Sequence, residues 1–148
     1  MLNIRIAELK DAEKIAKNNV YLAKESEDLD IDYKTTYKGV KAIISDKNKG
    51  FFIVTELNRK IIGELMVTYE WSDWRSKDFW WIQSVYVDKE HRKQGIFNKM
   101  KDFIIKLAKE NNIDKVRLYV HNKNKDAINA YEKSNMKKDD YIIYKAIY

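Results

Sequence analysis

One junction constrains the fold of this chain most: a strand-like run that passes through a basic turn directly into an amphipathic helix. Residues 85–88 are mostly apolar, residues 89–95 form the turn, and apolar side chains recur at helical spacing from Ile96 onward. Gly95 closes the turn and is one of only four glycines in 148 residues. Because glycine adopts backbone conformations that other residues resist, its place here indicates a tight strand-to-helix connection in a mixed α/β domain.

The same turn has the chemistry of an anion site. The first N–H groups of a helix have no intrahelical partners and the helix dipole is positive there, so main chain alone can bind a diphosphate. Arg92 and Lys93 add positive charge beside Gly95. An ordinary connection with solvated basic side chains explains the turn equally well, so a second signal is needed to decide between them.

That signal lies downstream, where a strand-like run over residues 116–120 precedes Asn124, Ala127 and Tyr131. With the first turn, these residues resemble the GNAT superfamily of acetyl-CoA-dependent N-acetyltransferases, most clearly over residues 79–136. The family's later pattern, Asn-x-x-Ala-x-x-x-Tyr, is matched with its spacing intact.

The family's earlier pattern, Arg-x-x-Gly-x-Gly/Ala, has its three fixed positions at Arg92, Gly95 and Phe97. Phe97 departs from the small residue that the family usually has there. A second departure is Asn135, which stands where the family usually has glycine. We expect Asn135 to adopt the left-handed conformation that asparagine tolerates better than most residues.

The resemblance implies transfer of an acetyl group from acetyl-CoA to a primary amine, on a small molecule or a peptide, by direct attack in a ternary complex. No metal is implied. The residues that would contact the cosubstrate are Val85, Tyr86, Val87, Arg92, Lys93, Gln94, Gly95, Ile96, Phe97, Asn98, Asn124 and Tyr131.

The resemblance assigns Tyr131 as the catalytic general acid that protonates the departing sulfur; packing on the helix face is its structural alternative. Asn124 would bind the pantetheine arm, cap the helix that begins near Lys125, or do both. A main-chain N–H near Val85 would stabilise the oxyanion.

The general base stays open. The family often has a carboxylate near the position of Gln83, and the candidates in its place are Glu64, Glu70, Asp73, His121 or a chain of water molecules.

Composition fits one domain over residues 1–148, since this length can bury a sizeable core. No apolar run is long enough for a membrane span, and the start is strand-like and unlike a signal peptide. The chain has no cysteine, which excludes disulfides and Cys-ligated zinc and favours a cytoplasmic location.

A formal net charge of +6 is compatible with a phosphorylated cofactor or with nucleic acid. Residues 25–32 are acidic, however, which a uniform polyanion-binding surface would not include, and no nucleic-acid partner is expected. These acidic residues could favour the approach of a cationic amine. Alternatively, they form a solvated loop in which Asp30 or Asp32 caps the next helix. A non-catalytic RNA-binding module and an acyl-CoA sensor remain as alternatives, and the chain is expected to be a monomer or homodimer.

The spacing predicts strands, helices and one hairpin in the order βααβββαβαβ. The resemblance implies a GNAT-like α/β fold with a central, mostly antiparallel mixed sheet of six to seven strands and about four helices. The predicted strands cover residues 3–9, 51–56, 61–69, 79–87, 115–120 and 141–147, and the predicted helices cover 11–23, 33–46, 96–108 and 125–133.

All four tryptophans fall within residues 71–81, which we place between the third and fourth strands. With Asp73, these rings could wall a pocket for a cationic amine. They could instead cover the sheet or form a dimer contact.

Overall fold

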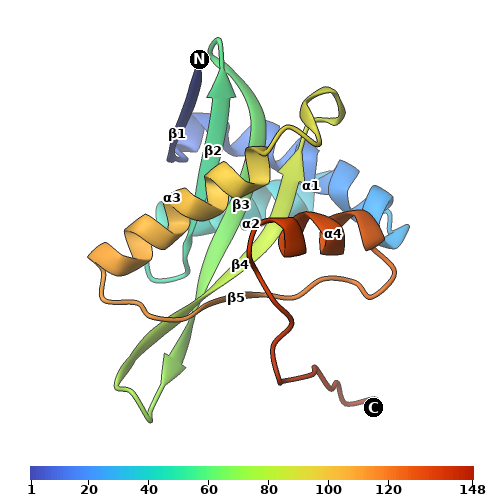
Figure 1. The fold of residues 1–148 in the computed structure, drawn as a ribbon. Helices are drawn as coiled ribbons and strands as arrows, with labels where there is room; N and C mark the ends of the chain where they lie inside the picture. The colour runs from blue at the N-terminus through green and yellow to red at the C-terminus, as the bar shows by residue number, and fades with distance from the viewer.

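The computed structural model describes residues 1–148 and is built on one five-stranded sheet with the order β1-β2-β3-β4-β5 (Figure 1). The first four strands are antiparallel, and β5 is parallel to β4. The strands are β1 (Leu2–Ile6), β2 (Phe51–Leu57), β3 (Lys60–Ser72), β4 (Lys77–Val87) and β5 (Val116–Leu118).

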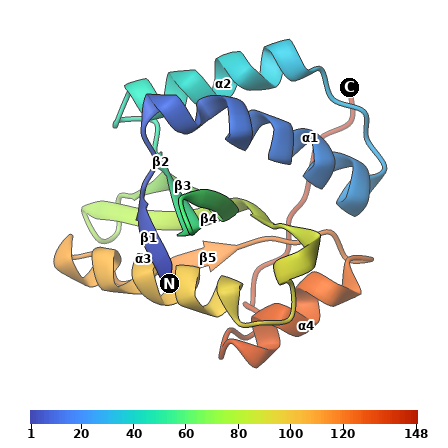
Figure 2. The same ribbon diagram turned by 90° about the horizontal axis from the view of Figure 1, so that it is seen from above.

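Two helices cover each face of the sheet (Figure 2). One face carries α1 (Ala12–Glu27) and α2 (Tyr33–Ser45), and the other carries α3 (Ile96–Glu110) and α4 (Lys125–Lys133). Two short 3-10 turns, Leu9–Asp11 and Lys89–His91, precede α1 and α3. The helix between β4 and β5 allows these strands to be parallel, as the strand-helix-strand pattern predicts.

Local signals explain most of these elements. Asn58 and Arg59 both have positive φ and close the β2–β3 hairpin. Asp32 begins α2 by accepting a hydrogen bond from the N–H of Thr35 at 2.8 Å, so the capping prediction for Asp32 is confirmed. Asn135 has φ 63° after α4, as predicted for the position of the family's glycine.

The apolar core lies in two layers, one on each face of the sheet. The predicted apolar face of α3 packs on the sheet through Ile96, Met100 and Ile104. On the other face, Ile15 and Ala16 of α1 pack against Phe52 and neighbouring strand residues. The two layers hold β3 and β4 rigidly between the helices, which fixes the position of the strand end described below.

The sheet has five strands, so the expectation of six to seven is wrong. The missing element is the predicted strand over residues 141–147, which is exposed and not paired with any strand. Its sequence favours a strand, but a strand also needs a neighbour for its main-chain hydrogen bonds, which local sequence does not reveal.

The tryptophan-rich segment differs from the prediction in part. Trp80 and Trp81 lie in β4, inside the predicted strand 79–87, but Trp71 lies opposite Asp78 within the β3–β4 hairpin, because β3 continues to Ser72. Trp80 belongs to the core, and Trp74 is 88% exposed at the hairpin turn.

Candidate functional site

The centre of the candidate site is the gap that opens between β4 and β5. Pairing between them ends at Ile82 and Leu118, whereas β4 continues to Val87 (Figure 1). The last five residues of β4 therefore have a neighbouring strand only on the β3 side. Main chain left without a strand partner in this way can pair with an extended ligand.

A bulge in β4 lies at the point where the strands separate. Tyr86 pairs with Glu64 and Gln83 pairs with Met66, so Ser84 and Val85 together face one residue of β3. Ser84 has φ 51°, a left-handed conformation that reorients the strand. Of the predicted cosubstrate contacts, Val85 belongs to this bulge and Tyr86 and Val87 follow it, all on the part of β4 that β5 does not cover.

The turn that follows β4 presents unpaired main-chain donors. The N–H groups of Lys93, Gln94 and Gly95 donate to no protein atom, and no side chain caps the first turn of α3. Gly95 has φ 78°, and a Cβ built on it would meet no atom within 4 Å. The turn is thus open above Gly95 and has the donors and helix dipole that an anionic group requires.

Side chains of the turn point in different directions. Lys93 and Gln94 are exposed, and the Gln94 amide donates to the carbonyl of Glu90 at 3.2 Å. Ile96 is buried against Gly63, so only its main chain is available to a ligand, whereas Asn98 is exposed.

Arg92 connects the turn to β4 and to α1. Its Nε donates to the carbonyl of Val87 at 2.8 Å, and its Nη2 lies 2.8 Å from a carboxylate oxygen of Glu25 in α1. The guanidinium also lies over the Tyr86 ring, 5.4 Å from its centroid. Arg92 therefore connects the end of β4, the turn that follows it and the last part of α1.

Tyr131 of α4 lies beside the first turn of α3. Burial raises the pKa of its hydroxyl to about 12, and that hydroxyl makes no hydrogen bond within the protein. Its ring packs on Phe97 with centroids 4.9 Å apart. Phe97 is 8% exposed, so the large side chain at a usually small position turns inward and supports Tyr131. The packing alternative for Tyr131 is thus observed, and its role as general acid stays a prediction.

Asn124 is the N-cap of α4, where its side-chain oxygen accepts from the N–H of Ala127 at 3.2 Å. The capping alternative is confirmed. Asn124 also lines a polar cleft of about 320 Å³ between the end of α1 and the start of α4. The other residues that line this cleft are Glu25, Ser26, Lys123, Lys125 and Asp126.

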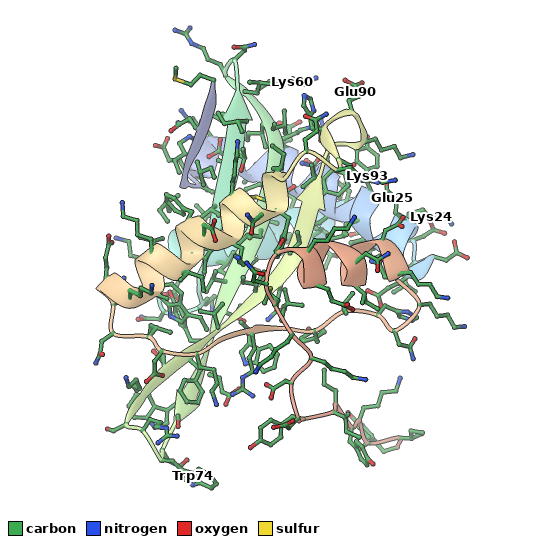
Figure 3. All side chains as sticks on the ribbon, viewed as in Figure 1. Lys24, Glu25, Lys60, Trp74, Glu90 and Lys93 are labelled. Atoms are coloured by element: carbon green, nitrogen blue, oxygen red, sulfur yellow. The ribbon has the colours of Figure 1, made fainter.

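The side chains proposed as general base are dispersed. Asp73 lies at the β3–β4 hairpin turn next to Trp74, and Figure 3 shows Trp74 at the opposite end of the molecule from Lys93. His121 is exposed and accepts from the N–H of Lys123 at 3.2 Å. Neither Asp73 nor Trp74 lines the candidate site, so the acceptor pocket suggested by these residues is not formed there.

The other two candidates, Glu70 and Glu64, lie on β3. Glu70 accepts from the indole N–H of Trp81 at 2.8 Å and lies 3.5 Å from Arg117. Gln83, in the position where the family often has a carboxylate, donates to the Thr68 hydroxyl at 2.6 Å.

Glu64 has a different environment. It is 0% exposed and neither carboxylate oxygen has a hydrogen-bond partner. Burial raises the pKa of Glu64 well above its ordinary value, which Asn18 and Lys14 only partly offset. Asn18 of α1 is also fully buried and lies close enough to Glu64 to lower its pKa, but the two side chains do not meet the geometry of a hydrogen bond. Sequence reasoning missed Asn18, although its position three residues after Ile15 on the buried face of α1 could have indicated it.

No helix combines the length and apolar character needed to cross a membrane. No group of three or more His, Cys, Asp and Glu side chains is placed to hold a metal ion.

Comparison with known proteins agrees with this geometry. The profile of the Acetyltransferase (GNAT) family matches residues 8–136. A crystal structure of a possible acetyltransferase from Clostridium difficile 630 has 44% sequence identity and a TM-score of 0.91, and the match covers 100% of this chain and 98% of that chain. No curated protein matches the chain.

More distant structures share the fold. A predicted acetyltransferase from Clostridium acetobutylicum, solved with acetyl-CoA, has 22% identity and a TM-score of 0.80, over 99% of this chain and 96% of that chain. Ribosomal-protein-alanine N-acetyltransferase from Brucella melitensis biovar Abortus 2308 has 16% identity and a TM-score of 0.80, over 100% of both chains. From its family profile and its near relative, the chain belongs to the GNAT family of acetyltransferases and is an acyltransferase.

Proposed function

We propose that this acyltransferase moves the acetyl group of acetyl-CoA to a primary amine, on a small molecule or a peptide, by direct attack within a ternary complex. One observation carries the proposal: the unpaired end of β4 leads into a turn with free N–H donors, and the Tyr131 ring of α4 packs beside that turn on Phe97 at the start of α3. An extended arm bearing a diphosphate fits this combination.

The residues present fit acetyl-CoA. The N–H groups of Lys93, Gln94 and Gly95 would hold the diphosphate, because they have no partner in the protein and space is open above Gly95. The main chain of Val85 and Val87 would hold the pantetheine arm in the manner of a neighbouring strand. When bound, the cosubstrate supplies a thioester carbonyl and a thiolate leaving group.

Tyr131 is proposed as the general acid. With a pKa of about 12 its hydroxyl keeps its proton throughout the neutral range and can donate it to the departing sulfur. Phe97 keeps the Tyr131 ring in place, which limits the number of orientations of the hydroxyl. A main-chain N–H near Val85 would stabilise negative charge on the reacting carbonyl oxygen without reorganisation.

The acceptor is proposed to be a cationic amine that loses one proton before attack. The cleft beside Asn124 has two carboxylates, Glu25 and Asp126, and two lysines, so its lining carries no net charge. Support for a cationic acceptor comes from the acidic segment 25–32 that continues from the cleft, whose carboxylates would attract a positively charged molecule. Water is our proposed first acceptor of the amine proton, since Glu64 lies beneath α1 and Glu70 is paired with Arg117.

Tyr131→Phe tests the proposal. We expect turnover, followed by thiol release with a panel of amines, to fall by about 10²–10⁴-fold, the range for loss of a general acid. Acetyl-CoA affinity measured by calorimetry should stay nearly unchanged, because the substitution keeps the ring that packs on Phe97. Tyr119→Phe, at an exposed tyrosine, is the matched control. Undiminished turnover in Tyr131→Phe would refute the assigned role.

The acyl-CoA sensor remains the second candidate, supported by Gln83, whose amide replaces a carboxylate and is bound to Thr68. A sensor would bind acetyl-CoA in the calorimeter but release no thiol with any amine in the panel. Failure to bind acetyl-CoA would remove both candidates and leave the polyanion-binding alternative, whose affinity must fall steeply with salt.

A further inference from the structure

The helix α4 is attached to the rest of the protein by few contacts. All of its residues keep part of their surface accessible, and neither apolar layer of the core includes a residue of α4. Among the hydrogen bonds and ion pairs of the protein, one joins residues 121–136 to the remainder of the chain. The position of α4, and with it the position of Tyr131, therefore depends on a small number of side chains.

That single hydrogen bond comes from Lys101 of α3. The Lys101 ammonium donates to the main-chain carbonyl of Ser134, the C-cap of α4, at 2.6 Å. Both groups lie largely away from bulk water, since the Lys101 side chain is 12% exposed and Ser134 is 6% exposed. A hydrogen bond from a charged donor, shielded in this way, is stronger than one between neutral groups in water.

The carbonyl that Lys101 binds belongs to a helix end that favours a cation. The last carbonyls of a helix have no intrahelical partners, and the helix dipole is negative there. An ammonium at this end satisfies one carbonyl and interacts favourably with the dipole. Figure 1 shows the C-terminal end of α4 directed toward α3. The Lys101 ammonium also lies 3.2 Å from Asp102, but that carboxylate is 64% exposed and contributes little.

Phe97 and Lys101 lie one turn apart on α3, so their side chains are on the same side of that helix. Phe97 contacts the Tyr131 ring, and Lys101 binds the carbonyl of Ser134, three residues after Tyr131. Neither Phe97 nor Lys101 belongs to the apolar layer that packs α3 on the sheet. Two contacts, one apolar and one charged, thus hold the last turn of α4 against the first two turns of α3.

We propose that Lys101 is a positioning residue, which fixes α4 on α3 and thereby determines where the Tyr131 hydroxyl lies. This inference rests on the role proposed above for Tyr131 as general acid. The contact between Phe97 and Tyr131 alone would let α4 pivot about the two rings, because apolar contacts are not directional. The hydrogen bond from Lys101, one turn away, restricts that movement. Position matters to a proton donor, since a displacement of about 1 Å can cost roughly 100-fold in rate.

Hydrogen exchange at the main-chain N–H groups of residues 128–136 measures the docking of α4 independently of activity. Because α4 has only 9 residues, it should lose its helical hydrogen bonds when it leaves α3. Lys101→Met keeps an unbranched side chain and removes the donor. Loss of a charged hydrogen bond corresponds to roughly 10–100-fold in an equilibrium constant, so exchange in this segment should become faster by up to that factor.

Two further variants of α3 make this measurement specific. Lys106→Met, at an exposed residue of the same helix, is the matched control and should leave exchange in residues 128–136 unchanged. Lys101→Arg keeps a charged donor, so exchange in this segment should be slower than in Lys101→Met. Circular dichroism and urea unfolding establish that each variant is folded.

Turnover then shows whether Lys101 acts through Tyr131. Lys101→Met should lower turnover by about tenfold or more. It should weaken acetyl-CoA binding less, because the free N–H groups of the turn before α3 do not belong to α4. When Lys101→Met is added to Tyr131→Phe, turnover should change little, since no hydroxyl is left to position.

Three results would overturn the inference. The first is exchange in residues 128–136 that is the same in Lys101→Met as in Lys106→Met. The second is exchange in Lys101→Arg that is as fast as in Lys101→Met. The third is an equal loss of turnover from Lys101→Met with and without Tyr131→Phe, which a merely structural role would give because destabilisation lowers the active fraction in both cases.

Failure of the proposed function has a different signature. Undiminished turnover in Tyr131→Phe alone would remove the general acid, and the catalytic part of the inference with it, whatever Lys101→Met does. A fall in turnover in Tyr131→Phe, combined with unchanged exchange in Lys101→Met, would keep the general acid and refute only the role of Lys101.

Discussion

Replacing Glu64 with glutamine should make the protein's stability less sensitive to pH. Glu64 is 0% exposed and both its oxygens lack hydrogen-bond partners. Burial of this unpaired carboxylate raises its pKa well above the ordinary 4.5, and the charge of Asp88 adds to the rise. The folded protein therefore holds the Glu64 proton at pH values where the unfolded chain has released it.

The sign and size of the effect follow from this difference in bound protons. Because the pKa is raised in the folded state, the stabilising contribution is complete below pH 4.5 and is lost as pH rises toward the folded-state pKa. Within that window the free energy of unfolding falls by at most about 1.4 kcal/mol per pH unit. The glutamine in Glu64→Gln does not titrate. As pH rises, the free energy of unfolding of the variant should therefore increase relative to that of the wild type, by at most about 1.4 kcal/mol per pH unit.

Urea unfolding of both proteins between about pH 5 and pH 8 measures the difference directly. Titrations of all other groups largely cancel in the comparison. Glu27→Gln, at an exposed carboxylate, controls for the removal of one negative charge. The reasoning would be refuted if the difference in the free energy of unfolding between the wild type and Glu64→Gln did not change with pH. It would also be refuted if that difference shifted in favour of the wild type as pH rises.

Two further predictions concern the site. In urea unfolding, Asn124→Ala should lower the free energy of unfolding by about 1 kcal/mol through loss of the α4 cap, whereas Asn124→Asp should keep the cap. If Asn124→Asp keeps the stability but not the acetyl-CoA affinity measured by calorimetry, the amide also contacts the cosubstrate. If Asn124→Asp keeps both, Asn124 acts only as a cap. Calorimetry should show that Arg92→Ala weakens acetyl-CoA binding more than Glu25→Gln does, because Arg92→Ala loses both the contact with Val87 and a positive charge at the turn. Equal effects of the two substitutions would show that Arg92 acts only through its ion pair with Glu25.

Elements with strong local signals could be predicted from the sequence. Gly95 between a strand and an apolar helical face indicated α3, and the structure buries Ile96, Met100 and Ile104 as the spacing predicts. The Asn124 cap likewise follows from the residue type and its place before α4. The cosubstrate contacts proposed from the family motifs stay predictions.

Features that depend on distant partners could not be predicted in the same way. Residues 141–147 have strand propensity, but whether they form a strand depends on a sheet edge outside the segment. Glu64 was one polar residue in an apolar run, and its full burial depends on α1, more than forty residues earlier. Trp71 was predicted between two strands because local sequence did not show that β3 extends to Ser72.

Under the proposed function, the contacts of Arg92 would couple the binding of the two substrates. One guanidinium binds the carbonyl of Val87 and the carboxylate of Glu25, which lines the polar cleft. An amine that pairs with Glu25 competes for the partner of Arg92, and a phosphate that attracts Arg92 leaves Glu25 without its cation. Linkage requires these influences to be reciprocal: whatever factor acetyl-CoA imposes on the affinity for the amine, the amine imposes on the affinity for acetyl-CoA.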